Sequence, residues 1–512
     1  MTMSAARVLA EVQQAQTRLA RFVPAPTPFE AVSLPGLSLP VFLKREDISP
    51  VRSYKWRGAF NRMMHLAESG DSRPVVTASA GNHAQGVAWA ARMLGMRANI
   101  YMPVSTPMVK QQAVRMHGGT NVHVELVGDT YNQAADAAHA QSERTGEIYV
   151  PAFDNLHTIA GQATMGTEIV ASNAGPFDVA FLQIGGGGMA AGVSSVLRAA
   201  YPGIRLIGVE GEGQACMKAS LDASRLVTLN QVDGFCDGTA VTRPGDLCFD
   251  VCRETLDDVI TVSNGDIHSA MKMMWDTTRT IPEPSGAMGL AGLLQWSGLH
   301  PEARDARMMT VISGANMDFN KLRDLFSGAA ENTKGRRHMR LTIGEQNGSL
   351  VELAETCFSD VNIIGFQYGK VDHVNAWPVI VFDADDAKMA SITSCLKATG
   401  VAYEDITGAP DANVIHYDAR LFSNPLVLQV SFPERKGALR EFMRAVRPHA
   451  NMCYFNYQYT GDVQSTALMV FEFKSGDQHA PFLDAIRHSP VTFRPVDDRV
   501  RARMLYNAPG PV

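Results

Sequence analysis

Four short segments of the chain hold reactive or anion-binding groups in an order that suggests a single site. They are Ser53–Ala59, Ser79–His83, Gly185–Met189 and Ser313–Asn316. The first contributes the amine of Lys55, which can trap an aldehyde as a Schiff base. The second contributes backbone N–H groups that can bind an anion. The third consists mainly of glycines, so its backbone can come close to a phosphate, and the fourth contributes a neutral hydroxyl. Each segment alone has an ordinary structural explanation, so the prediction depends on their combination.

Together the four segments match the needs of pyridoxal phosphate (PLP), which is held by its aldehyde, phosphate, phenolic oxygen and ring nitrogen. Lys55 is the predicted catalytic residue, because the lysine that binds this cofactor later removes the Cα proton of the substrate. A surface lysine on a helix is the simpler explanation of Lys55 taken by itself. The three downstream segments favour the cofactor.

A run of four glycines follows an apolar stretch that we expect to be a strand, and a predicted helix follows the run. Such a turn lets backbone N–H groups close on a phosphate, and the helix N-terminus adds a favourable field. A dinucleotide is the alternative occupant, but the run lacks the G-x-G-x-x-G spacing and comes late in the chain. We therefore assign the phosphate to Gly185, Gly186, Gly187, Gly188 and Met189.

The second segment also lies between a predicted strand and a predicted helix. Its residues are Ser79, Ala80, Gly81, Asn82 and His83. The N–H groups and the Ser79 hydroxyl suit the carboxylate of an amino-acid substrate, and Asn82 can donate to the phenolic oxygen of the cofactor. A plain helix N-cap is the simpler explanation of this segment.

Ser313 ends an apolar run that we expect to be a strand. A hydroxyl facing the pyridine nitrogen leaves that nitrogen unprotonated, so the ring withdraws electrons more weakly. This setting favours expulsion of a β-substituent over transamination, for which an aspartate would be expected. By itself, Ser313 is more simply a serine at a strand end.

Short apolar runs alternate with helical patterns from Val41 to about Phe326. Strands are predicted at 74–77, 98–102, 122–127, 179–184, 204–209 and 308–313, and helices at 82–94, 107–117, 131–145 and 189–200. The alternation predicts an α/β domain in which a parallel sheet is covered by helices on both faces.

The C-terminal part does not continue this alternation and contains an internal repeat. Four pairs of identical residues recur at one constant offset: Gly348 and Gly437, Asn362 and Asn451, Phe366 and Phe455, and Tyr368 and Tyr457. Each copy reads as strand, glycine turn, helix and strand. The predicted domains are 1–327, a linker at 328–338, and α+β domains at 339–424 and 425–512.

The composition excludes several other functions. A chain of 512 residues with 46% hydrophobic residues is long enough for several globular domains. The net charge of −6 argues against nucleic-acid binding, and no apolar run of about 18 residues predicts a membrane span. The seven scattered cysteines complete no zinc pattern, so we expect no metal site, a reduced cytoplasmic setting, and cysteines that serve as packing residues.

The chain resembles the fold-type II PLP-dependent enzymes of the tryptophan synthase β-like family, which implies a catalytic domain of parallel sheets with helices. Within that family it looks like the biosynthetic threonine dehydratases. The four segments occur in the family's order, and three further matches are Lys44–Asp47, Ala160–Gln162 and Glu283–Ala287. The likeness covers nearly all of the first 326 residues. Tyr54 and Trp56 stand where the family usually has phenylalanine and leucine.

The resemblance implies a function and its regulation. The catalytic domain would convert L-threonine to 2-oxobutanoate and ammonia, the first committed step of isoleucine biosynthesis. The repeat resembles paired ACT-like domains, which bind isoleucine as an inhibitor and valine as its antagonist, and a homotetramer is implied. Ser79–His83 would hold the substrate carboxylate with Asn155 as a neighbour, and Glu283 would line the pocket. Residues around Gly437, Leu439, Asn451 and Tyr457 are the candidates for the effector site.

Other functions stay open from sequence alone. A serine dehydratase or serine racemase of the same fold usually lacks the paired repeat, and a threonine synthase would need a basic pocket for a phosphorylated side chain. A non-catalytic amino-acid sensor would use the repeat alone. Intact Lys55, Ser313 and glycine run argue against that sensor.

Overall fold

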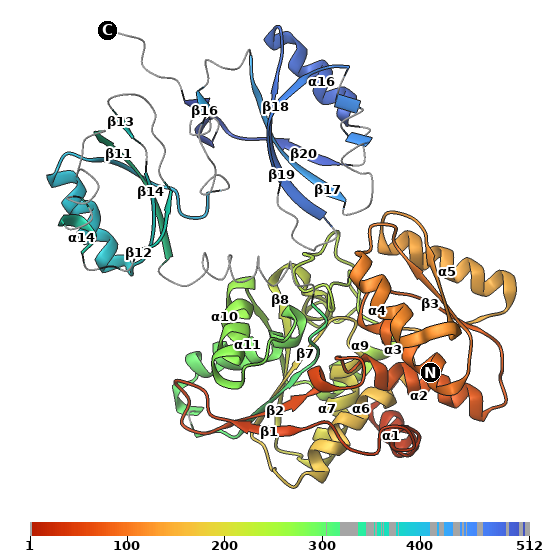
Figure 1. Cartoon of the computed structure of the whole chain (residues 1–512). Helices are drawn as coiled ribbons and strands as arrows, with labels where there is room; N and C mark the ends of the chain where they lie inside the picture. The colour runs from red at the N-terminus through yellow and green to blue at the C-terminus, as the bar shows by residue number, and fades with distance from the viewer. Residues whose placement is uncertain are drawn as a thin grey trace. The chain divides into compact units, whose positions relative to one another are not determined.

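The structure is a computed structural model of the 512-residue chain. It describes residues 3–303, 305–317 and 336–506, the last range with gaps at 345–352, 354–355, 360, 362, 368–374, 377, 410–416, 419–423, 434–440, 443–444, 447, 458–463, 488–490 and 501–504. The chain divides into two compact units, Met1–Asp318 and Phe319–Val512 (Figure 1). Each unit is described below by itself.

The larger sheet of the first unit carries most of its core. Its strand order is β1 (Phe29–Val32), β2 (Val41–Arg45), β10 (Met308–Ile312), β7 (Val179–Gln183), β8 (Arg205–Gly211) and β9 (Asp258–Val262). The strands from β2 to β9 run parallel, whereas β1 pairs antiparallel with β2. The run Val179–Gln183 is buried along its whole length, which is typical of a parallel strand covered on both faces.

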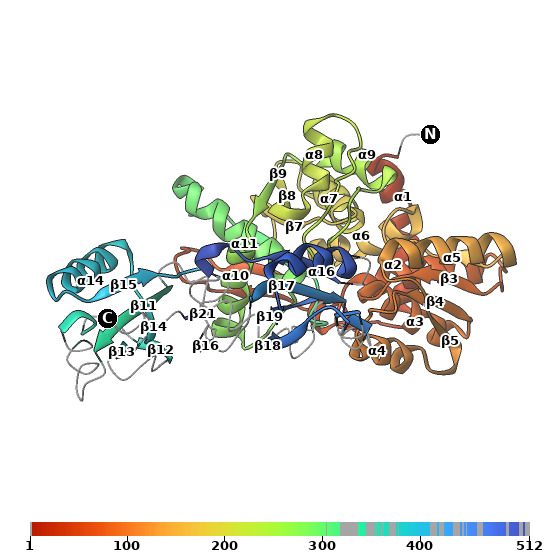
Figure 2. The same cartoon turned by 90° about the horizontal axis from the view of Figure 1, so that it is seen from above.

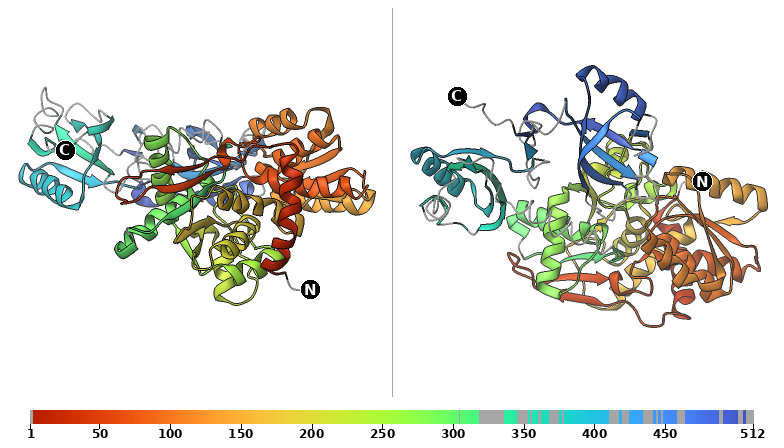
Figure 3. Two further views of the ribbon diagram at one scale, coloured as in Figure 1. Left: turned by 90° about the horizontal axis from the view of Figure 1, so that it is seen from below. Right: turned by 45° about the horizontal axis from the view of Figure 1, so that its top comes forward.

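Helices pack on this sheet from both sides (Figure 2). α11 (Pro284–Leu299) contacts β7 to β10, and α6 (Leu156–Ala171) packs against α7 (Gly188–Ala200). The N-terminal α1 (Ala5–Ala20), red in Figure 3, lies on α6 and α7. The unit also contains α8 (Cys216–Asp222), α9 (Asp246–Thr255) and α10 (Asn264–Thr278).

A second parallel sheet is formed by the chain between β2 and β7. Its order is β5 (Val122–Leu126), β4 (Ala98–Met102), β3 (Val75–Ala78) and β6 (Ile148–Tyr149). It is associated with α2 (Lys55–Glu68), α3 (Asn82–Leu94), α4 (Met108–Gly118) and α5 (Tyr131–Thr145). The alternating pattern predicted a parallel sheet, and the family resemblance implied parallel sheets with helices; the structure confirms the latter, with two sheets that have separate cores.

The second unit begins with an α+β sheet. β11 (Arg336–Gly344) pairs antiparallel with β14 (Val379–Asp383) and β15 (Ala402–Asp405), and β12 (Ile363–Gln367) pairs with β14. α14 (Asp386–Ala398) contributes Ile392 and Leu396 to its core. β11 starts inside the predicted linker of residues 328–338, because Arg336 to His338 continue the ladder with β14.

A second α+β sheet repeats this arrangement. β17 (Leu426–Pro433) pairs antiparallel with β19 (Gln464–Glu472) and β20 (Thr492–Pro495), and β18 (Asn451–Tyr457) pairs with β19. α16 (His479–Ile486) takes the place that α14 has in the first copy. Short strands complete the unit: β13 (Asn375–Ala376), β16 (Tyr417–Asp418) and β21 (Leu505–Tyr506).

The two copies share the same strand pairing, which bears out the repeat over the residues that the structure describes. Even an irregularity recurs: the register shifts between Ile363 and Gly365 in β12 and between Met452 and Tyr454 in β18. Phe366, Phe455, Asn451 and Tyr457 lie in these strands. The other matched residues, together with Leu439, are outside the described residues: Gly348, Asn362, Tyr368 and Gly437.

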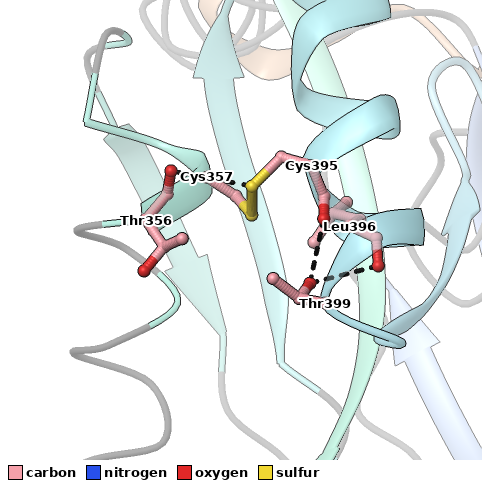
Figure 4. The surroundings of a disulfide bond; sticks show 5 residues. All are labelled: Thr356, Cys357, Cys395, Leu396 and Thr399. Atoms are coloured by element: carbon pink, nitrogen blue, oxygen red, sulfur yellow. Dashed lines mark hydrogen bonds between the residues drawn. A yellow bond between two sulfur atoms is a disulfide. The ribbon is translucent and has the colours of Figure 1, made fainter.

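One cysteine expectation was wrong. Cys357 and Cys395 form a disulfide, with an S–S distance of 2.04 Å, that joins a short helical stretch to α14 (Figure 4). The two residues are 38 positions apart, and only the packing of their segments brings the sulfurs together. The four cysteines of the first unit are buried thiols, as predicted for packing residues: Cys216, Cys236, Cys248 and Cys252.

Over the described part of the chain, no helix is both long and apolar enough to cross a membrane. In the same residues, no group of three or more His, Cys, Asp or Glu side chains is arranged to hold a metal ion.

Candidate active site

Lys55 lies beside the strand end that carries Ser313. The segment before α2 forms an antiparallel bridge between Ser53 and Gly314. The backbone N–H of Tyr54 donates to the carbonyl of Ser313 at 3.0 Å. α2 then starts at Lys55, whose Nζ is 5.3 Å from the centroid of the Tyr54 ring. The segment that carries Lys55 and the segment that carries Ser313 are therefore in direct contact.

A buried charge network anchors the first turn of α2. Arg57 pairs with Glu46 at 2.8 Å and with Glu168 of α6 at 2.7 Å, and Lys44 of β2 pairs with Glu168 at 2.5 Å. The side chains of Lys44, Glu46 and Arg57 are at most 1% exposed. Burial alone would lower the pKa of Arg57, but the two carboxylates outweigh it and raise the pKa above its usual value. The network fixes the helix turn that presents Lys55.

The loop from Ser79 to Gly81 joins the end of β3 to the start of α3, and Ala80 is half-buried within it. The Ser79 hydroxyl accepts the N–H of Gly81 at 3.2 Å. His83 turns inward, with Nε2 3.0 Å from the carbonyl of Val150. Burial, and to a smaller extent the charge of Lys55, lowers the pKa of His83 to about 4, so its ring is neutral near pH 7. This leaves the backbone and Ser79, not the imidazole, as the groups of the loop that suit an anion.

Asn82 is the first residue of α3, and its amide joins the loop to the Ser313 region. Its Nδ2 donates to Oε1 of Glu283 at 2.6 Å, and its Oδ1 accepts from Nδ2 of Asn316 at 2.8 Å. Glu283 is 4% exposed, and burial raises the pKa of its carboxyl to about 7. Asn82, Glu283 and Asn316 thus form one contact group at the edge where Lys55 and Ser313 lie.

The glycine run forms the turn between β7 and α7, with Gly188 and Met189 as the first residues of the helix. A Cβ would approach Thr239 at Gly185, the ring of Phe153 at Gly186, Cys248 and Met217 at Gly187, and Cβ of Phe153 at Gly188, each at 3.0 Å or less. Gly187 also has φ +96°, a conformation that favours glycine. A Cβ at Gly185, Gly186 or Gly187 would force neighbouring atoms to shift, and one at Gly188 would be in tight contact with Phe153.

The topology places the glycine run and Ser313 at one edge. β7 and β10 are neighbouring parallel strands, so their carboxyl ends meet there, as ligand-binding residues do in open α/β sheets. Ser313 is 4% exposed, and its hydroxyl lies 3.4 Å from the carbonyl of Ser285, which is a long hydrogen bond. The Ser313 hydroxyl is thus only weakly engaged by the protein.

Asn155 has a local role that the sequence did not suggest. It is the N-cap of α6, and its Oδ1 accepts the N–H groups of His157 and Thr158 at 3.0 and 3.3 Å. Its place beside a substrate carboxylate stays a prediction. No pattern in the sequence indicated two further residues near the site. Phe153 packs on the glycine run but belongs to no recognised motif. Asn316 lies in the segment of Ser313 but had no predicted role.

These residues fit PLP. The run Gly185–Gly188, here called the glycine cradle, suits the phosphate, and Lys55 suits the aldehyde carbon. Asn82 suits the phenolic oxygen, and Ser313 suits the ring nitrogen. The weakly bonded Ser313 hydroxyl and the cradle that side chains would fill are the structural features that carry this fit.

Two family models match this chain. The family model "Pyridoxal-phosphate dependent enzyme" matches residues 21–314, and "C-terminal regulatory domain of Threonine dehydratase" matches residues 422–503. The biosynthetic L-threonine dehydratase IlvA of Burkholderia multivorans is 36% identical over 86% of this chain and 88% of its own. The enzyme of the same name from Escherichia coli is 36% identical over 86% of each chain.

Solved structures of two threonine deaminases resemble part of this chain. Processed threonine deaminase isoform 2 from Solanum lycopersicum has a TM-score of 0.58 and 38% identity, and covers 62% of this chain and 88% of its own. The T.th. threonine deaminase has a TM-score of 0.56 and 31% identity, over 61% of this chain and 99% of its own. The chain therefore belongs to the pyridoxal-phosphate dependent enzymes and, within them, to the family of biosynthetic threonine dehydratases.

Proposed function

We propose that this chain uses PLP to convert L-threonine to 2-oxobutanoate and ammonia, the first committed step of isoleucine biosynthesis. The observation that carries the proposal is the bridge between Ser53 and Gly314, which brings the Lys55 segment against the Ser313 strand end. The relatives named as biosynthetic threonine dehydratases support threonine as the substrate.

In this reaction, PLP would supply an electron sink for the charge that develops at Cα of the substrate. The amine of Lys55 holds the cofactor between turnovers and accepts the Cα proton when the substrate has replaced it. The hydroxyl of Ser313 would hold the ring nitrogen as a neutral partner, a setting that favours loss of the β-hydroxyl over transamination. Ser79 and the N–H groups of the following loop hold the substrate carboxylate, with Asn155 as their neighbour.

The repeated sheets of the second unit would regulate this activity. Isoleucine would bind there as a feedback inhibitor and valine would oppose it, which requires that isoleucine bind the less active state more tightly. The match of residues 422–503 to a threonine dehydratase regulatory domain supports this role. Asn451 and Tyr457 of β18 are the candidate effector residues that the structure describes. We further propose a cytoplasmic homotetramer.

The deciding experiment measures 2-oxo acid formation by the purified protein with L-threonine or L-serine, each with and without L-isoleucine. Preferred turnover of threonine that isoleucine suppresses supports both the reaction and its regulation. Serine turnover without an isoleucine response assigns the chain to a serine dehydratase branch. Bound cofactor without turnover of either amino acid points to a sensor.

A second experiment tests the catalytic residue. Lys55→Ala removes both the anchor of the cofactor and the base, so we expect turnover to fall by roughly a thousandfold or more, within the range of lost nucleophile and base contributions. The visible absorption of the lysine-bound cofactor should disappear as well. Lys272→Ala changes a lysine that is 56% exposed on α10 and is the matched control. Wild-type turnover in the Lys55 variant contradicts the assignment.

A further inference from the structure

A chain of hydrogen bonds with one polarity runs through Asn82. It starts at the carbonyl of Val51, which can only accept. Nδ2 of Asn316 donates both to this carbonyl, at 2.7 Å, and to Oδ1 of Asn82, at 2.8 Å. Nδ2 of Asn82 then donates to Oε1 of Glu283 at 2.6 Å. Both N–H groups of the Asn316 amide are therefore used.

Glu283 closes this chain into a ring. Its Oε2 accepts the backbone N–H of Asn316 at 3.1 Å. Its own backbone N–H donates to the carbonyl of Gly314 at 3.0 Å, and its position as N-cap of α11 fixes it further. Both oxygens of Glu283 therefore act as acceptors in these contacts, from the Asn82 amide and from the Asn316 N–H.

The ring allows only one orientation of the Asn82 amide. Reversal would place Nδ2 of Asn82 against Nδ2 of Asn316, which opposes donor to donor at either protonation state of Glu283. When Glu283 is ionised, reversal would also place Oδ1 of Asn82 against its Oε1, acceptor to acceptor. In the observed orientation one N–H of Asn82 is used on Glu283, and the second N–H has a fixed direction. Asn82 comes from the smaller parallel sheet's α3, whereas Glu283 and Asn316 come from elements of the larger sheet.

We infer that Glu283 and Asn316 are positioning residues, which hold the second Nδ2 hydrogen of Asn82 toward the phenolic oxygen of PLP. The inference rests on the proposed function, because it takes Asn82 as the ligand of that oxygen. A donor held in place by its neighbours loses little freedom when the cofactor binds. The same donor stabilises negative charge on the phenolic oxygen, which the visible absorption of bound PLP reports.

The test is a double-mutant cycle read by PLP affinity. PLP is titrated into the apo form of the full chain and followed by its absorption, in wild type, Asn82→Ala, Asn316→Ala and the double variant. We expect each single change to weaken PLP binding about tenfold, the size of one hydrogen bond. If Asn316 acts through Asn82, the double variant binds PLP no more weakly than Asn82→Ala. The absorption of bound PLP should shift alike in all three variants.

Two further variants keep the test independent of folding defects. Asn121→Ala removes an amide that donates to the carbonyl of Met96 at 3.0 Å and should leave PLP affinity unchanged. Glu283→Gln keeps an oxygen for Asn82 but turns a donor toward the N–H of Asn316, so a smaller loss of about threefold is expected.

Additive losses in the double variant would overturn the inference, since Asn316 would then act independently of Asn82. Unchanged affinity in Asn82→Ala would overturn it too. Turnover of threonine by the wild-type protein in the same preparation shows separately whether the proposed function holds.

Discussion

Lys55 carries the expected chemistry, yet its site is formed as much by residues without side chains as by reactive ones. The glycine cradle has neighbours on its outer side at every position, with Phe153 against two of the four glycines. Backbone N–H groups are therefore the surface that this turn offers to an anion. Substitutions in the cradle should therefore lower the affinity for PLP more than they lower the stability of the fold.

Gly187→Ala tests this view of the cradle. The residue has φ +96°, and a Cβ would come within 2.8 Å of Cys248 and Met217. The strained backbone should cost about 1–2 kcal/mol of stability, and PLP affinity should fall roughly tenfold or more as the cradle shifts. Thermal unfolding and PLP titration measure the two effects. Gly203→Ala, at a position with nothing within 4 Å of a Cβ, is the control. Equal effects at both positions would argue against a packed cradle.

Glu283 should give the protein a characteristic pH dependence. Burial raises the pKa of its carboxyl to about 7 and the charge of Asp237 adds to the rise, whereas the Asn82 amide, the charge of Lys110 and the Asn316 N–H oppose it. In the unfolded chain the group titrates near 4.5. Between these values the folded protein binds more protons, so stability falls as pH rises.

The stability that Glu283 contributes is thus fully present below pH 4.5 and is lost as pH rises through about 7. Relative to Glu283→Gln, wild type should lose on the order of 3 kcal/mol across this window. Urea unfolding of both proteins at several pH values measures the difference. The exposed Glu302→Gln is the control and should run parallel to wild type. Parallel curves for Glu283→Gln would contradict the raised pKa.

At the scale of elements, α2 owes its position to buried charges. Arg57 meets two carboxylates from η1 (Glu46–Ile48) and α6, and Lys44 shares one of them. Buried ion pairs contribute little net stability when intact, but the loss of one partner leaves an uncompensated charge in the interior. The network therefore specifies where the first turn of α2 lies more than it strengthens the core.

Arg57→Met should be severely destabilising. Glu46 would lose its guanidinium partner while staying buried, and Glu168 would keep only Lys44 as a cationic partner, so we expect a loss of about 3–5 kcal/mol in the free energy of unfolding. Urea denaturation followed by circular dichroism measures it. Lys272→Met breaks an exposed pair with Asp276 and should cost less than about 1 kcal/mol. A comparable small loss for Arg57→Met would mean that the network is dispensable.

At the scale of the whole molecule, the chain joins a catalytic unit to a repeated regulatory one. The T.th. threonine deaminase covers 61% of this chain and 99% of its own, so it is the shorter chain. The two sheets of the second unit have separate cores, and their four equivalent strands pair in the same order, with β13 as an addition to the first sheet. Catalysis and regulation are thus expected to be separable.

A chain shortened to residues 1–327 should keep threonine turnover and lose its response to isoleucine. The physical reason is linkage: an inhibitor shifts activity only if it binds the two states with different affinity, and the shortened chain lacks the proposed binding unit. Initial rates over a series of isoleucine concentrations, for both lengths, measure the effect. Full inhibition of the shortened chain would assign isoleucine to the catalytic unit.

Much of the secondary structure follows from local sequence. The predicted helices at 82–94 and 131–145 and the strand at 98–102 have the observed bounds of α3, α5 and β4. Local signals explain this agreement: Gly95 ends α3 in a left-handed conformation, and a capping box from Thr130 to Gln133 starts α5. The constant offset of the repeat likewise predicted two sheets with equivalent strands.

The residue types of the site were also predictable from the sequence, because glycine, lysine and serine near strand ends indicate particular chemistry even in short segments. Their assembly was not. Ser53 contacts Gly314 because β2 and β10 are neighbours in the larger sheet. Asn316, which follows β10 of the larger sheet, contacts Asn82, which follows β3 of the smaller one, so their contact depends on how the two sheets pack. The split into two sheets and the disulfide from Cys357 to Cys395 have the same origin.

The sequence alone thus determined the elements, the repeat and the chemical groups, since these depend on contacts within a few residues. Tertiary structure decided which strands became neighbours, and with them which groups meet at Lys55. Strand order depends on how apolar faces are buried between segments far apart in the chain, and no local pattern encodes that choice.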